Sequence, residues 1–405
     1  MKRVARALGG LLLLSVLDGC AMLGGNVKVE PVAVGTQKPG NVALYVAVSH
    51  RGSGVVGLQK QDFKVYENGV ALDNDQIQLT LLPTDTSATR RAAVLVDMSK
   101  SLKPSERRSL ADALRPFITR LRQREAVSLY AYDGAEKVHL VQEYARDARA
   151  EPDEKDTSMD RLLYFSRRDA STSLYSAVVD GSQKLSATLA SEGRPIQSGT
   201  LIVIALNPDS AGRVDDDKLH DFVNESPHHY FLMTVGTWAS DSNVTFLGKN
   251  GATRAGSPMT MSAPLNDVAN AVDDDYFRNY LVSYCSPGRA GKRDLKLEVI
   301  THDAQGKPSV GSYSTEFDAT GFGPGCNAQA TPHFAIEKPQ EPTAIAMNKP
   351  VAGRARSAAK LTAKAPAASP TEREKISSTT PAPTPAPKAS GAAPIAEPPS
   401  GLGYE

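Results

Sequence analysis

Oxygen-bearing side chains of the kind that bind hard metal ions follow directly on an apolar run of the chain. The run covers residues 92–96, and Asp97, Ser99 and Ser101 come after it. An uninterrupted apolar run of this kind is typical of a central strand in a parallel sheet. In an open α/β sheet, ligands bind outside the carboxyl ends of the strands, where these side chains fall. The segment therefore predicts a ligand-binding site.

Three segments of the chain together resemble the von Willebrand factor A (vWA) domain with its metal-ion-dependent adhesion site. Residues 97–101 match the family's Asp-x-Ser-x-Ser, and residues 172–177 resemble its Thr-x-Leu-Tyr-x-Ala turn. The third segment departs from the family, because Asn207 stands where the aspartate of Thr-Asp-Gly is usual, with Asp209 two residues later. The resemblance covers roughly residues 92–285.

The resemblance implies a site for Mg²⁺ or Mn²⁺ built from three hydroxyl groups and a carboxylate that holds a coordinated water, supplied by Ser99, Ser101, Thr172 and Asp97. Asn207 removes one negative charge, which lowers the affinity for metal and strengthens the attraction of a bound metal for an acidic partner. Asp209 restores the charge if its loop bends inward. The alternative is a degenerate site, in which Asp97 caps the following helix and the serines bond to the backbone.

The surrounding hydrophobic pattern alternates between strands and helices. Beyond residues 92–96 it predicts strands at 127–132, 137–141 (an antiparallel edge), 201–206, 230–235 and 280–284. Helices are predicted at 110–121, broken or kinked by Pro116, at 174–189 and at 264–272. This alternation predicts a doubly wound, mostly parallel α/β sheet of the vWA or Rossmann-like class.

Period-two patterns on both sides of this domain predict a small β module. Residues 41–90 form its first part, and the string at 57–69 resembles the immunoglobulin-like segment that precedes vWA domains in some exported bacterial proteins. Strands within residues 287–326 are expected to complete the module. The vWA domain, residues 91–286, is therefore predicted to be an insertion in one β-sandwich.

The first 20 residues predict export and a lipid anchor. Positive residues precede a short apolar run at 7–17, and the sequence then resembles a bacterial lipobox that ends at Cys20, with Asp18 as a departure. The alternative is an ordinary cleaved signal before an unmodified cysteine. Because Ala21 rather than Asp follows, the resemblance favours the outer membrane. Residues 21–40 are predicted to be a polar spacer.

The remaining cysteines and the C-terminal composition extend this prediction. If Cys20 carries lipid, Cys285 and Cys326 remain as a pair in an oxidising compartment, so they are predicted to form a disulfide.

Residues 327–405 contain about half of the 27 prolines and almost no large apolar residues. This composition predicts a disordered tail.

Charge and motif content narrow the function classes. A net charge of +1 with 22% charged residues provides no basic surface for nucleic acid. The sequence has no phosphate-binding loop, His-Glu-x-x-His motif or nucleophile elbow, so no enzyme is predicted. We expect a membrane-anchored lipoprotein that binds or adheres to a protein presenting an acidic side chain, with help from a metal. The alternative is a metal-independent structural tether whose tail contacts the cell wall.

Overall fold

The computed structural model describes residues 27–152, 157–238, 244–302 and 305–335. The predicted signal, lipobox and Cys20, and the tail from residue 336 onward, lie outside the described residues. No helix within these ranges is both long enough and apolar enough to cross a membrane.

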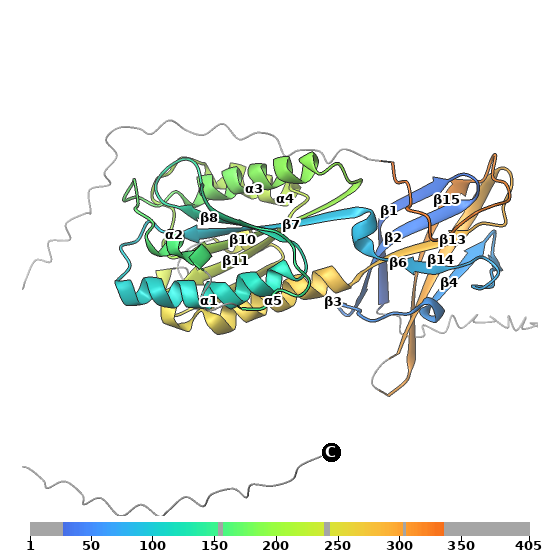
Figure 1. Ribbon diagram of the computed structural model, residues 1–405, viewed down its shortest axis with the longest axis horizontal. Helices are drawn as coiled ribbons and strands as arrows, with labels where there is room; N and C mark the ends of the chain where they lie inside the picture. The colour runs from blue at the N-terminus through green and yellow to red at the C-terminus, as the bar shows by residue number, and fades with distance from the viewer. Residues whose placement is uncertain (1–26, 153–156, 239–243, 303–304, 336–405) are drawn as a thin grey trace, which may run out of the picture. The chain divides into compact units, whose positions relative to one another are not determined.

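A six-stranded sheet forms the centre of the α/β domain (Figure 1). Its strands are β7 (Ala88–Asp97), β8 (Ala126–Tyr132), β9 (His139–Tyr144), β10 (Ile196–Ala205), β11 (His229–Val235) and β12 (Gly251–Ala255). The order across the sheet is β12-β11-β10-β7-β8-β9, in which β9 alone runs antiparallel to its neighbour. Counted along the chain this order is 3-2-1-4-5-6, which is one of the doubly wound class, and a doubly wound sheet is what the sequence predicted.

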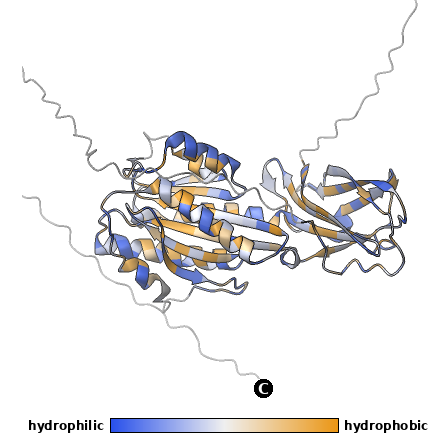
Figure 2. Cartoon of the chain, turned by 90° about the horizontal axis from the view of Figure 1, so that it is seen from above, coloured by the Kyte–Doolittle hydropathy of each residue, from blue (hydrophilic) through white to orange (hydrophobic). Residues whose placement is uncertain are grey.

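Helices cover both faces of this sheet. They are α1 (Pro104–Arg122), α2 (Asp160–Leu163), α3 (Leu174–Ser191), α4 (Asp216–Glu225) and α5 (Ser262–Phe277). Alternate residues of β7 pack against opposite helix layers: Val94 shares a core with α1 and α5, and Leu95 shares one with α3 and α4. Figure 2 shows the apolar strands between helices whose outer faces are hydrophilic. The sequence predicted that Pro116 would kink or break its helix, and α1 continues through Pro116 without a break.

Two antiparallel sheets with a shared apolar core form the β-sandwich. The first contains β1 (Val27–Gln37), β2 (Asn41–His50), β13 (Asn279–Cys285) and β6 (Thr80–Leu82), with β3 (Ser53–Gly54) beside β2. The second contains β15 (Pro308–Asp318), β14 (Lys292–His302), β4 (Phe63–Glu67) and β5 (Val70–Ala71). Strands from both sides of the α/β domain pair here, since β2 pairs with β13 and β4 pairs with β14.

Three segments differ from the expectation. Residues 280–284 were expected in the parallel sheet, but β13 lies in the sandwich, where Val282 and Tyr284 are fully buried in the apolar core. The spacer predicted at 21–40 contains β1, which pairs along its length with β2. The tail was expected to begin at 327, yet residues 327–335 lie against the fold, and Phe334 is only 6% exposed.

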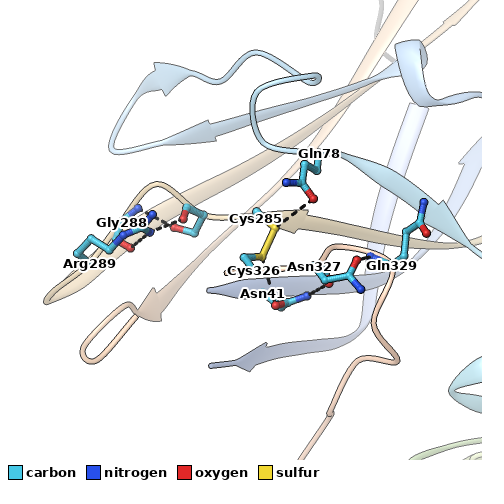
Figure 3. The surroundings of a disulfide bond; sticks show 9 residues. Asn41, Gln78, Cys285, Gly288, Arg289, Cys326, Asn327 and Gln329 are labelled. Carbon is cyan, nitrogen blue, oxygen red and sulfur yellow. Dashed lines mark hydrogen bonds between the residues drawn. A yellow bond between two sulfur atoms is a disulfide. The ribbon is translucent and has the colours of Figure 1, made fainter. Parts of the chain in front are cut away.

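The predicted disulfide between Cys285 and Cys326 is confirmed (Figure 3). Cys285 is the last residue of β13, and Cys326 follows the last strand of the sandwich. The bond closes a loop with a sequence separation of 41 residues. Asn41 contacts the same region, because its amide donates to the carbonyl of Asn327 and its side-chain oxygen lies 3.2 Å from Cys326 Sγ.

Candidate functional site

The predicted site lies where the strand order of the parallel sheet reverses. From β7 the chain crosses through α1 to β8, whereas from β10 it crosses through α4 on the opposite face to β11. Doubly wound sheets bind ligands at this switch point, outside the carboxyl ends of the two strands. Asp97 is the last residue of β7, and Asn207 follows the end of β10 by two residues. We call Asp97, Ser99, Thr172 and Asn207 the switch-point site.

The Asp97 carboxylate is fully buried and joins the two loops. Its Oδ1 accepts the backbone N–H of Ser99 at 2.9 Å and the Ser99 hydroxyl at 2.6 Å. Its Oδ2 accepts the backbone N–H groups of Leu206 and Asn207, both at 3.0 Å. Burial raises the pKa of Asp97, while the hydrogen bonds from Ser99, Leu206 and Asn207 act in the opposite direction.

The hydroxyl groups of Ser99 and Thr172 meet beside this carboxylate. Their oxygens are 2.6 Å apart, although the residues are 73 positions apart in the chain. Thr172 is positioned by the loop after β10, because its backbone N–H donates to Ser210 Oγ at 2.8 Å and its carbonyl accepts the Ser210 N–H at 2.8 Å. Ser101, the third predicted hydroxyl ligand, is exposed on the loop after β7. The fold thus brings Ser99 and Thr172 together on Asp97.

Asn207 faces the site with its amide nitrogen. Nδ2 lies 3.4 Å from Asp97 Oδ2 and 3.2 Å from Ser99 Oγ, so the side chain offers N–H donors to two oxygens of the site. With the amide turned the other way, its oxygen would face the negative Asp97 oxygen, which is unfavourable. The residue therefore replaces the expected negative charge by a neutral donor.

Asp209 does not supply the missing carboxylate. Its Oδ1 accepts the backbone N–H of Tyr175 at 3.1 Å, in the first turn of α3, and its Oδ2 accepts the N–H of Gly212 at 2.9 Å. A carboxylate at a helix amino terminus is stabilised by the helix dipole, which explains this orientation. Burial raises the pKa of Asp209, and hydrogen bonds from Tyr175, Gly212 and Leu174 oppose the shift.

These contacts test whether the site fits a divalent cation. Hydroxyl oxygens of Ser99 and Thr172 converge next to Asp97, and Ser101 is accessible on the adjoining loop. Within the described ranges, no group of three or more His, Cys, Asp and Glu side chains is placed to hold a metal. The arrangement therefore fits a cation site that relies on hydroxyl groups and is one carboxylate short.

Arg167 is a neighbour of the site that the sequence reasoning missed. Its guanidinium donates to the backbone carbonyl of Ser99 at 3.0 Å. Arg167 lies in the loop before Thr172, and no local pattern in the sequence links it to the segment after β7. It places one positive charge beside the switch-point site.

Comparisons with known proteins give fold-level likenesses only. No family model matches the sequence, and no curated protein matches it. A von Willebrand factor type A protein from Catenulispora acidiphila is 8% identical over 73% of each chain, with a TM-score of 0.36. The proximal thread matrix protein 1 of the mussel byssus is 12% identical over 46% of this chain and 48% of its own, with a TM-score of 0.33.

A third similar structure is that of the manganese-loaded Plasmodium vivax TRAP protein. It is 9% identical, covers 64% of this chain and 99% of its own, and has a TM-score of 0.30. At these values the likenesses carry no argument about function, which must come from the site itself. The strand order and the two helix layers establish the fold class: a doubly wound α/β domain together with an antiparallel β-sandwich.

Proposed function

We propose that this chain is an exported, lipid-anchored binding protein whose α/β domain takes an acidic side chain of a partner protein with the help of Mg²⁺ or Mn²⁺. The proposal rests on the hydroxyl pair of Ser99 and Thr172, 2.6 Å apart beside the buried Asp97 at the switch point. Ser99, Ser101 and Thr172 would hold the ion, and Asp97 would orient one of its waters. When bound, the ion supplies positive charge that attracts a carboxylate.

The charge of the site explains the preference for an acidic ligand. Asp97 is the one carboxylate of the switch-point site, because Asn207 is neutral and Asp209 is turned to α3. A divalent cation there keeps a net positive charge, which the carboxylate of a partner would neutralise. Metal and partner should therefore bind cooperatively, each raising the affinity of the other by the same factor.

Calorimetry on residues 21–405 tests this mechanism. Mn²⁺ is titrated alone and in the presence of a glutamate-rich peptide, and we expect tighter Mn²⁺ binding with the peptide. Thr172→Val should abolish the effect. Ser171→Ala is the matched control, since the Ser171 hydroxyl donates to Asp169 at 2.8 Å and not to the site. Peptide binding that survives both EDTA and Thr172→Val would refute the mechanism.

A metal-independent tether is the second candidate, favoured by one observation. The Asn207 amide donates to Asp97 and Ser99, so the site satisfies its own polar groups without an ion. In this case the chain would hold an assembly through another face, and its C-terminal segment would dock to the cell wall. Deleting residues 336–405 separates the two, because it leaves the packed Phe334 in place. Loss of cell-wall retention with unchanged Mn²⁺ binding would favour the tether.

The lipid anchor is a separate part of the proposal. It rests on the apolar run at 7–17 followed by Cys20. Cys20→Ser should move the exported chain from the membrane fraction to the soluble periplasmic fraction, whereas Cys326→Ser should leave its fractionation unchanged. An equal membrane content for Cys20→Ser and the unaltered chain would exclude lipidation at this residue.

A further inference from the structure

Four arginines converge on a cavity at the amino ends of the parallel strands, whereas the switch-point site lies at their carboxyl ends. The cavity has a volume of about 160 Å³ and lies at the amino ends of β7 and β8. Its arginines come from four different segments and are Arg90, Arg124, Arg146 and Arg194. The acidic residues that line it are Asp85 and Glu192. A convergence of this kind needs an explanation, because like charges held close together repel each other.

The carboxylates near the cavity are already used by partners. Asp85 pairs with Arg146 at 2.8 Å, and Glu192 pairs with Arg91 at 2.5 Å, outside the lining. Arg124 binds Asp273 at 2.9 Å, which also lies outside the lining. The lining therefore contains more positive charge than its own carboxylates neutralise.

Two of the arginines have donors left over. Arg194 contacts the backbone carbonyl of Ala88 at 3.4 Å, and it makes no ion pair with any residue that the structure describes. The side chain of Arg90 is 11% exposed and lies 3.5 Å from Asp275, while its buried Nε has no hydrogen-bond partner in the described chain. Arg194 therefore lines the cavity with N–H donors that no carboxylate of the described chain occupies, and an acceptor in the cavity could bind them.

One tyrosine brings three of these charges together. The guanidinium groups of Arg90 and Arg124 lie 5.2 and 5.7 Å from the ring centroid of Tyr276. Arg146 approaches the hydroxyl of the same ring at 3.4 Å. The negative face of the aromatic ring offsets part of the repulsion but does not carry a full charge. Each of these three arginines also has a carboxylate partner, so the positive charge left for a ligand is chiefly that of Arg194, which lines the same cavity as Tyr276.

We propose that this cavity is a binding site for a small oxyanion of the phosphate class. A tetrahedral oxyanion offers acceptors in several directions, and guanidinium groups bind such ions through paired N–H donors. At about 30 Å³ for each water, the volume corresponds to about five water molecules, which suits an ion of phosphate size. The site is independent of the proposed metal chemistry, because none of its residues belongs to the switch-point site.

Calorimetric titration of residues 21–405 with sodium phosphate tests the proposal, with sodium chloride at matched ionic strength as the blank. We expect saturable phosphate binding and a higher melting temperature in phosphate than in chloride. Arg194→Gln should weaken the binding at least tenfold, and it leaves no carboxylate unpaired. Arg108→Gln is the matched control, because Arg108 is exposed on α1 and removes the same charge away from the cavity.

The outcomes separate the cavity from a general charge effect and from the metal site. Equal weakening in Arg194→Gln and Arg108→Gln would overturn the proposal, and so would the absence of saturable binding by the unaltered chain. Thr172→Val should bind phosphate like the unaltered chain, so that failure of the proposed metal site leaves this result intact. A circular dichroism spectrum of Arg194→Gln checks that the variant is folded.

Discussion

The substitution Asn207→Asp tests the account of the switch-point site most directly. The amide nitrogen that it replaces lies 3.4 Å from Asp97 Oδ2 and 3.2 Å from Ser99 Oγ. The new carboxylate would stand against Asp97, which is fully buried. Without metal, the two negative charges repel, and with metal, both attract the cation. The same substitution should therefore lower stability and raise metal affinity.

The magnitudes follow from these distances. Two unit charges 4 Å apart interact by about 4 kcal/mol at an effective dielectric constant of 20. Proton uptake by the pair relieves part of the repulsion, so we expect the metal-free variant to lose about 1–3 kcal/mol of stability at neutral pH. A dication and a carboxylate about 4 Å apart attract by about 2 kcal/mol even with water-like screening, so the Mn²⁺ complex should become at least roughly 30-fold tighter.

The assay combines urea unfolding in EDTA with Mn²⁺ calorimetry. Asn224→Asp is the control, because Asn224 is exposed on α4 and undergoes the same change of charge. We expect Mn²⁺ to stabilise Asn207→Asp but not Asn224→Asp. A folded Asn207→Asp variant with no gain in Mn²⁺ affinity would refute the assignment of residue 207 to the metal site.

Three further predictions concern stability. Cys326→Ser removes the disulfide to Cys285 and should lower the free energy of unfolding by about 2–4 kcal/mol in urea titrations. An unchanged free energy of unfolding would show that other contacts hold the loop. Burial, opposed by Arg90, raises the pKa of Glu125 from 4.5 to about 8. Between these pH values Glu125 keeps its proton in the folded chain and loses it in the unfolded chain, so the free energy of unfolding should fall as the pH rises from 4.5 to 8. The measurement is the melting temperature as a function of pH, and Glu125→Gln should show a smaller fall than the unaltered chain. An equal fall in the variant would show that another group causes it. Phe334→Ala should cost about 3 kcal/mol in the same urea titrations, whereas an exposed side chain would cost almost nothing.

The sequence predicted those parts of the fold that depend on local patterns. The apolar run of β7 and the helical spacing in α1 required burial in a layered α/β sheet, and both elements lie there. The strand β12 escaped prediction because Gly251–Ala255 contains no large apolar residue and forms through pairing with β11. Local sequence also cannot tell which sheet a strand joins, which is why β13 was assigned to the wrong one.

The same limit applies to the site. Asp97 and Ser99 could be assigned because they follow a strand directly, and strand direction fixes the edge at which they fall. The orientation of Asp209 depends on the path of a loop and on competition with the amino terminus of α3, neither of which is encoded by spacing. Arg167 reaches Ser99 across 68 residues of chain, so only the folded structure reveals this contact.

The way in which β13 enters the sandwich has a mechanical consequence. The α/β domain is attached on its C-terminal side through Phe277 of α5 and Asn279, the first residue of β13. Tension on that attachment pulls along β13, whose seven residues all pair with β2. Hydrogen bonds perpendicular to the pull are loaded in shear and must break together. The covalent bond at Cys285 secures the far end of the strand, so a load on the α/β domain would pass into the sandwich without peeling the strand away.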